Sequence, residues 1–182
     1  MKIKTRDMIL AALFTALTIV GAFIKIPIGP APISLQYLFI ALSGILLGPA
    51  LGSASQLVYV ILGLIGIPVF TSGGGLSYIF TPTFGYLISF IIAPLIIGSL
   101  IKNKKPSFLR IFIACFAALI VTYIIGSTYM YVILNYVSKI HMNILQVLKL
   151  AVIVFIPGDI SKCIIAALIG KKAIPILRKM EY

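Results

Sequence analysis

The sequence predicts an all-α integral membrane protein, a single domain over residues 1–182 that forms a bundle of six transmembrane helices. The first observation is composition. Of the 182 residues, 62% are hydrophobic and 10% are charged, whereas soluble domains are about 45–50% apolar and about 25% charged. The second is a series of six apolar segments with short connections, since about 20 residues suffice for one span. The third is the placement of the basic residues between these segments.

The first three helices are expected at residues 7–24, 35–48 and 51–66. The first apolar run superficially matches a signal peptide, but it has no convincing cleavage site, so we expect it to be retained. The loop 25–34 carries three prolines and cannot be helical throughout. A Gly-Pro pair marks the turn between the second and third helices.

The last three helices are expected at residues 84–101, 109–134 and 143–170. The preceding segment, 67–82, contains a Gly-Gly-Gly run and two prolines, so it is not one helix. Asn143 is positioned to cap the sixth helix, with Gln146 at the reciprocal position of a capping box.

The basic residues predict the orientation in the membrane. Eleven of the fifteen Lys and Arg lie in three clusters, and such clusters remain on the cytoplasmic side. Both termini and the loop 102–110 are therefore expected in the cytoplasm, and a five-helix arrangement would leave one terminal cluster outside. The net charge of +12 thus indicates topology and contact with anionic lipid headgroups, not a nucleic-acid partner. The clusters are Lys2, Lys4 and Arg6; Lys102, Lys104, Lys105 and Arg110; and Lys171, Lys172, Arg178 and Lys179.

A pair of opposite charges lies within the sixth apolar segment. Asp159 and Lys162 are three residues apart, so they share one face of a helix. A charge at mid-membrane costs about 2.5–3.5 kcal/mol on insertion scales, so the pair requires a reason. One reading is a structural ion pair that holds the helix to its neighbours. The other is a polar site for a transported molecule.

Irregular backbone near this pair favours the binding site. Pro157-Gly158 interrupts the sixth helix just before Asp159, and the loops 25–34 and 67–82 are expected on the outer side. Non-helical backbone at membrane depth is tolerated where it is buried in protein or lines a cavity. Broken helices also offer free N–H and C=O groups to a ligand. We therefore expect a pocket that faces outward.

The sequence lacks the motifs of several common ATP-binding, hydrolytic and metal-binding functions. The sequence has no Walker A loop, no HExxH and no GxSxG. Cys115 and Cys163 lie in apolar runs and His141 stands alone, so no metal site and no cofactor are expected. A substrate-binding subunit that takes its energy from a partner fits best. A stand-alone secondary transporter or channel, and a membrane enzyme with Asp159 as base, remain alternatives.

Four segments together resemble the BioY family, the biotin-specific substrate-binding S components of energy-coupling-factor (ECF) transporters. They are GLIGIPVFTSGGGLSYIFTPTFGYLISF at 63–90, IPIGPAPISLQ at 26–36, PGDISKC at 157–163, and the pair Ala12 and Ala16. One departure is Ser34, where the family more often has threonine. A hydroxyl is kept, so little is put in doubt.

The resemblance implies a six-helix S-component fold that captures biotin with high affinity at the outer face. It implies a transmembrane coupling subunit and two cytoplasmic ATPases as partners, with ATP hydrolysis by these partners driving release. Ala12 and Ala16, four residues apart on one helix face, match the alanine motif with which S components dock. An S component for another vitamin is the nearest alternative, since a fold does not dictate its ligand.

The chemistry of biotin suggests roles for the candidate residues. Asp159 can accept the ureido N–H groups, Lys162 can bind the ureido oxygen or the carboxylate, and Gln36 can donate and accept. Lys25 is a second candidate for the carboxylate, although a charge at the rim is its simpler role. The remaining candidates are aromatic walls and a flexible glycine run that closes over the ligand, namely Phe70, Tyr78, Tyr86, Gly73, Gly74 and Gly75.

Overall fold

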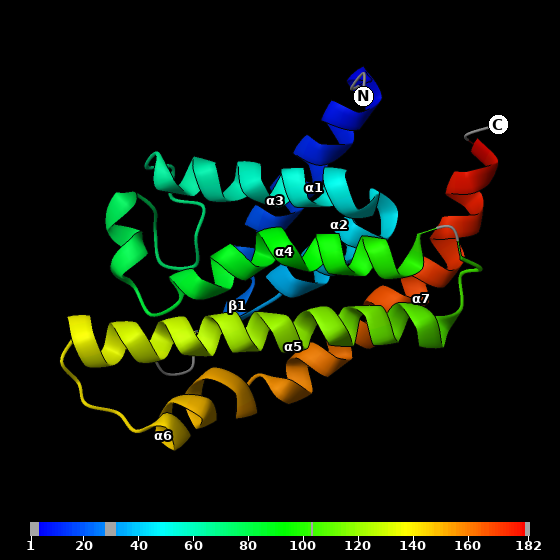
Figure 1. Ribbon diagram of the computed structural model, residues 1–182. Coiled ribbons are helices and arrows are strands. Elements are labelled where there is room, and N and C mark those ends of the chain that lie inside the picture. Colours follow the sequence, from blue (N-terminus) through cyan, green and yellow to red (C-terminus); the bar gives the residue numbers. More distant parts are fainter. Residues whose placement is uncertain (1–3, 28–31, 103, 181–182) are drawn as a thin grey trace.

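The computed structural model describes residues 4–27, 32–102 and 104–180, and Lys2 lies outside these ranges. Apart from one two-stranded ribbon, the regular elements are helical (Figure 1). In chain order they are α1 (Thr5–Phe23), β1 (Lys25–Ile26), β2 (Ile33–Ser34), α2 (Gln36–Leu46), α3 (Gly48–Leu64), the 3₁₀ turn η1 (Leu76–Phe80), α4 (Phe84–Ile101), α5 (Phe108–Val132), the π-helical turn η2 (Ile133–Val137), α6 (Ile144–Leu148), the π-helical turn η3 (Lys149–Ile153) and α7 (Ile156–Met180).

Four helical stretches are long and apolar enough to cross a membrane, namely Thr5–Phe23, Phe84–Ile101, Phe108–Val137 and Ile144–Leu177. The two other apolar helices, α2 and α3, are shorter. With 11 residues, α2 is about 16 Å long, roughly half of a bilayer core. The chain reaches α2 through an extended ribbon instead of a longer helix.

The ribbon occupies the loop that the prolines exclude from a helix. Lys25 pairs with Ser34 and Ile26 with Ile33, in antiparallel register. The amide of Leu35 donates to carbonyls near the end of α1, at 3.1 Å each. These bonds hold the start of α2 beside the end of α1, and this fixes the position of the residues that follow.

Helix α4 is central, because it packs against α2, α3 and α5. Glycines allow close approach in these contacts. A Cβ on Gly44 of α2 would lie 2.8 Å from the Cα of Pro94, and a Cβ on Gly98 would lie 2.4 Å from the amide nitrogen of Pro49. The main hydrophobic core lies between these helices and includes the fully buried Ile40 of α2 and Ile97 of α4.

The last apolar segment is broken, but the break lies at residues 154–155 and not at Pro157-Gly158 as predicted. Both residues belong to the first turn of α7, where a proline is tolerated. The predicted capping box is confirmed, with the amide of Gln146 donating to the Asn143 side chain at 2.8 Å and the reverse bond at 2.9 Å. The helical path is interrupted before α7 begins at Ile156. The predicted end near Gly170 is wrong, since α7 continues to Met180. Gly170 is a packing residue and not a helix stop, because a Cβ there would lie 2.8 Å from Ile45.

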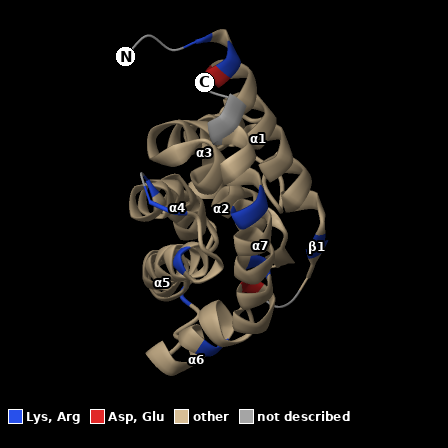
Figure 2. Ribbon diagram, turned by 90° about the vertical axis from the view of Figure 1, so that its right-hand side faces the viewer, with Lys and Arg blue, Asp and Glu red and all other residues tan. Residues whose placement is uncertain are grey.

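The start of α1, the end of α7 and the turn between α4 and α5 lie at one end of the bundle (Figure 1). Figure 2 looks onto this end and shows basic residues on several helices there. A cleft lies between the same parts of the chain, with a volume of about 1170 Å³ that includes open solvent. Its lining residues include Asp7, Gly48, Lys102 and Leu177. We call this the basic end. The loop between α3 and α4 and the connection from α5 to α6 lie at the opposite end.

Candidate ligand-binding site

A pocket opens between the ribbon, the loop 67–82 and helices α2, α4, α5 and α7. The empty space amounts to about 590 Å³, its open mouth included. Five of the predicted ligand-binding residues line it, namely Gln36, Tyr78, Tyr86, Asp159 and Lys162. The other lining residues are Pro32, Ser34, Tyr37, Thr71, Thr83, Leu87, Phe90, Thr122, Tyr123 and Phe155.

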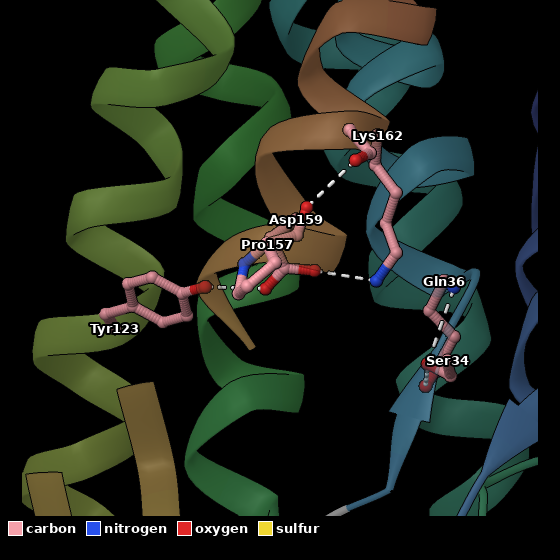
Figure 3. Close-up of polar contacts among 7 residues, drawn as sticks. Ser34, Gln36, Tyr123, Pro157, Asp159 and Lys162 are labelled. Carbon is pink, nitrogen blue, oxygen red and sulfur yellow. Dashed lines mark hydrogen bonds and ion pairs between the residues drawn. The ribbon is translucent and has the colours of Figure 1, made fainter. Parts of the chain in front are cut away.

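Asp159 and Lys162 form a buried ion pair in the wall of this pocket. The Lys162 ammonium lies 2.6 Å from Asp159 Oδ1, and the two residues are only 6% and 7% exposed. The Tyr123 hydroxyl donates to Asp159 Oδ2 at 2.7 Å (Figure 3). Since α7 begins at Ile156, Asp159 lies in its first turn, where the helix dipole stabilises a carboxylate. The break before α7 therefore places this carboxylate in the wall of the pocket.

Gln36, at the first position of α2, is held by a chain of hydrogen bonds. Its Oε1 accepts from the Ser34 hydroxyl at 2.9 Å, and its Nε2 donates to the Tyr59 hydroxyl at 2.7 Å. The Tyr59 hydroxyl in turn donates to the carbonyl of Val69 at 3.2 Å. In Figure 3 the Lys162 side chain extends toward the Ser34 and Gln36 side. Two polar groups from distant parts of the chain thus face one cavity in fixed orientations.

Aromatic rings form the apolar walls. Tyr86 crosses α5 at Gly126, where a Cβ would lie 2.4 Å from the ring, and its hydroxyl donates to the carbonyl of Ala151 at 2.6 Å. Phe155 lies beside it, with ring centroids 6.5 Å apart. The hydroxyl of Tyr78 in η1 forms hydrogen bonds with the hydroxyls of Thr71 at 3.2 Å and Thr83 at 3.3 Å. These bonds fix the rings before any ligand arrives, which lowers the entropic cost of binding.

Phe70, Gly74 and Gly75 are not among the lining residues. Phe70 is 1% exposed and packs against α3, where a Cβ on Gly63 would lie 2.0 Å from its ring. Gly75 has φ +101° and donates its amide to the Gly63 carbonyl at 2.7 Å. A Cβ on Gly74 would lie 2.3 Å from the Ile67 carbonyl. These three residues shape the loop from behind.

Lys25 lies where the ribbon meets the loop 67–82. Its ammonium donates to the carbonyl of Thr71 and so ties β1 to the loop 67–82. Thr71 lines the pocket, whereas Lys25 does not. The structure therefore places Lys25 at the rim.

Sequence reasoning did not assign several lining residues, among them Thr122 and Tyr123 of α5. The two are adjacent polar residues in the apolar run ALIVTYIIG. The criterion that drew attention to Asp159, a polar group inside an apolar span, would also have found them. The partner of Tyr123 on α7, Asp159, is 36 residues away and could not be read from spacing.

The predicted docking residues lie elsewhere. Ala12 and Ala16 are exposed on α1 and do not line the pocket. Apolar neighbours such as Ile9 and Leu13 are also exposed, at 63% and 50%. The small residues are thus available to a helix outside this chain.

The cysteines lie in the core, whereas the histidine lies at the surface. Cys115 and Cys163 are buried free thiols within the main core, and His141 is exposed. Among the residues that the structure describes, no three His, Cys, Asp or Glu side chains are grouped as metal ligands would be.

Together these groups suit a small ligand with an apolar body and a compact polar end. Asp159 offers a carboxylate that accepts hydrogen bonds, and Lys162 offers an ammonium that donates them. The side-chain amide of Gln36 can both donate and accept. Small-molecule sites combine apolar walls with a few fixed polar groups in this way. The ion pair faces a cavity, and this is the arrangement that a ligand-binding role requires.

Comparison with known proteins identifies the family. The BioY family model matches residues 1–179. The chain is 40% identical over 176 residues to a probable biotin transporter BioY of Lysinibacillus sphaericus, covering 96% of this chain and 90% of that one. It is 37% identical to the biotin transporter BioY of Thermotoga maritima, covering 97% and 98%. A crystal structure of the S-component for biotin from an ECF-type ABC transporter matches with a TM-score of 0.82 and 30% identity over 94% of each chain. The resemblance drawn from the four motifs is thereby confirmed, and the chain belongs to the BioY family.

Proposed function

We propose that this chain captures biotin in the pocket beside Asp159 and serves as the substrate-binding subunit of an ECF uptake transporter. The observation that carries the proposal is the buried Asp159–Lys162 pair, which opens into a cavity in a protein whose relatives are biotin transporters. The chain is a multi-pass protein of the prokaryotic cell membrane and a transport subunit, not an enzyme.

The ureido ring of biotin belongs at the charged end of the pocket. Its N–H groups donate to Asp159, and its oxygen accepts from Lys162 or from the amide of Gln36. Tyr86 and Tyr78 wall the bicycle, with Phe70, Gly74 and Gly75 holding the loop behind them. The valeryl tail then points toward the mouth, away from the Asp159 carboxylate that would repel it.

The topology we propose is a single domain of six spans with both termini in the cytoplasm. The basic end supports it, because it combines the start of α1, the α4–α5 turn and the end of α7. Positive clusters of this kind stay inside. The pocket and its loops then face outward, where a scarce vitamin is captured.

We further propose that α1 docks onto a transmembrane coupling subunit that works with two cytoplasmic ATPases. Exposed Ala12 and Ala16 support this, since small residues let helices approach closely. Ala16→Trp should abolish co-purification with the coupling subunit and leave biotin binding intact. Normal co-purification of the variant would contradict the docking role.

Calorimetry on the detergent-solubilised chain tests the ligand. Biotin should bind tightly, while thiamine and riboflavin should not. Binding of another vitamin in place of biotin would reassign the specificity. Biotin uptake into vesicles that hold this chain alone, driven by an ion gradient, would instead indicate a stand-alone secondary transporter.

A further inference from the structure

Thr122 carries a buried hydroxyl in the wall of the pocket, and no residue that the structure describes pairs with it. It is 3% exposed, and its Oγ1 forms no hydrogen bond within the described ranges. It is one of the residues that line the pocket. Buried polar atoms are nearly always paired, so an orphaned one calls for an explanation.

Other buried threonines in the helices do not behave this way. Thr15 and Thr18 of α1 each donate to the carbonyl four residues earlier, at 3.0 and 2.9 Å. That bond is the usual solution for a hydroxyl in an apolar helix. Gln56 Oε1 also lacks a partner in the described part of the chain, but Gln56 does not line the pocket. The unpaired hydroxyl of Thr122 therefore points to a partner that arrives from the cavity.

The position of Thr122 limits which part of a ligand it can meet. It lies one helical turn before Gly126, at which the Tyr86 ring crosses α5. Its neighbour Tyr123 donates to Asp159. Thr122 is thus on the α5 wall between the aromatic ring and the carboxylate, at the charged end of the pocket.

We propose that the Thr122 hydroxyl is a further ligand contact, which hydrogen-bonds the ring end of the bound molecule and contributes to specificity. The proposal depends on biotin being the ligand. A hydroxyl both donates and accepts, so it can pair with a ureido oxygen or N–H group. A ligand without a polar atom at that point leaves the hydroxyl unpaired and is rejected.

The test compares Thr122→Val, which has nearly the same shape, with Thr122→Ser, which keeps the hydroxyl. Thr18→Val is the matched control, a buried threonine away from the pocket. Calorimetry should show the Kd for biotin raised roughly 5- to 50-fold in Thr122→Val and changed by less than about threefold in the other two variants. Biotin amide, which lacks the carboxylate charge, should show the same ratio between parent and Thr122→Val.

Three results would overturn the assignment. They are a Thr122→Val affinity within about twofold of the parent, an equal loss in Thr122→Ser, and a ratio that vanishes with biotin amide. The second would indicate packing, and the third a contact with the tail. A parent chain that binds no biotin refutes the proposed function, and the assignment with it. If the parent binds biotin and Thr122→Val binds it equally well, only the role of Thr122 is refuted.

Discussion

Replacing Asp159 by asparagine separates a ligand site from a structural ion pair. The substitution removes the negative charge 2.6 Å from the Lys162 ammonium and keeps an oxygen that can accept from Tyr123. A hydrogen bond to a charged group contributes about 1.5–3 kcal/mol. At about 1.4 kcal/mol for each factor of ten, the Kd for biotin should rise roughly 10- to 150-fold.

The same substitution leaves a buried ammonium without its counter-charge. Removing one partner of a buried ion pair costs about 3–5 kcal/mol of stability, so Asp159→Asn should also unfold at a lower temperature. Removing both charges is often neutral. The double variant Asp159→Asn with Lys162→Met should therefore regain the stability of the parent.

The affinity of the double variant decides between the two roles. If the pair binds ligand, stability returns while biotin affinity stays at least about tenfold weaker. Calorimetry and thermal unfolding in detergent measure the two quantities on one preparation, with Asp7→Asn at the basic end as control. A double variant that recovers both stability and affinity would refute our reasoning and leave the pair a structural ion pair.

Three further substitutions probe the walls and the rim. Tyr123→Phe removes the 2.7 Å bond to the carboxylate and should weaken biotin binding about 3- to 10-fold by calorimetry. Gly126→Ala places a methyl group 2.4 Å from the Tyr86 ring, so displacement of the ring should weaken binding without loss of the fold. Lys25→Met removes the tie to the Thr71 carbonyl and should speed the exchange of labelled biotin.

Matched controls sharpen these expectations. Gly158→Ala adds a methyl group that meets only an ordinary contact, 3.6 Å from Ile33, and should bind as the parent does. Lys149→Met removes an exposed lysine outside the loops and should leave exchange unchanged. Equal effects in a control and in its test variant would contradict the assigned contact. Unchanged biotin affinity in Tyr123→Phe would show that the hydrogen bond from Tyr123 to Asp159 does not contribute to binding.

Local patterns were predictable from the sequence. The capping box at Asn143 depends on residues three apart and was found correctly. The charged pair was found because charges are rare in apolar helices. The end of α7 was missed, because Gly170 was read as a helix stop. In the structure Gly170 packs closely against Ile45 of α2 and the helix continues. That contact depends on tertiary packing and leaves no mark on the local sequence.

The same division applies to the site. Sequence could propose Phe70 and Tyr78 as neighbours in one loop, but only the fold shows that Tyr78 lines the pocket while Phe70 packs behind it onto α3. The link between Tyr123 and Asp159 joins two helices. Whether an aromatic residue faces a cavity or the layer beneath it depends on the approach of distant segments.

The brevity of α2 has a mechanical consequence. Gln36 lines the ligand pocket, while Gly44 lines the cleft at the basic end. Eight residues of helix, about 12 Å, separate the two, and Ile40 between them is fully buried. A packed layer about two helical turns thick therefore separates the ligand pocket from this cleft along α2. Passage of a molecule along α2 from the pocket to the cleft therefore requires this layer to move.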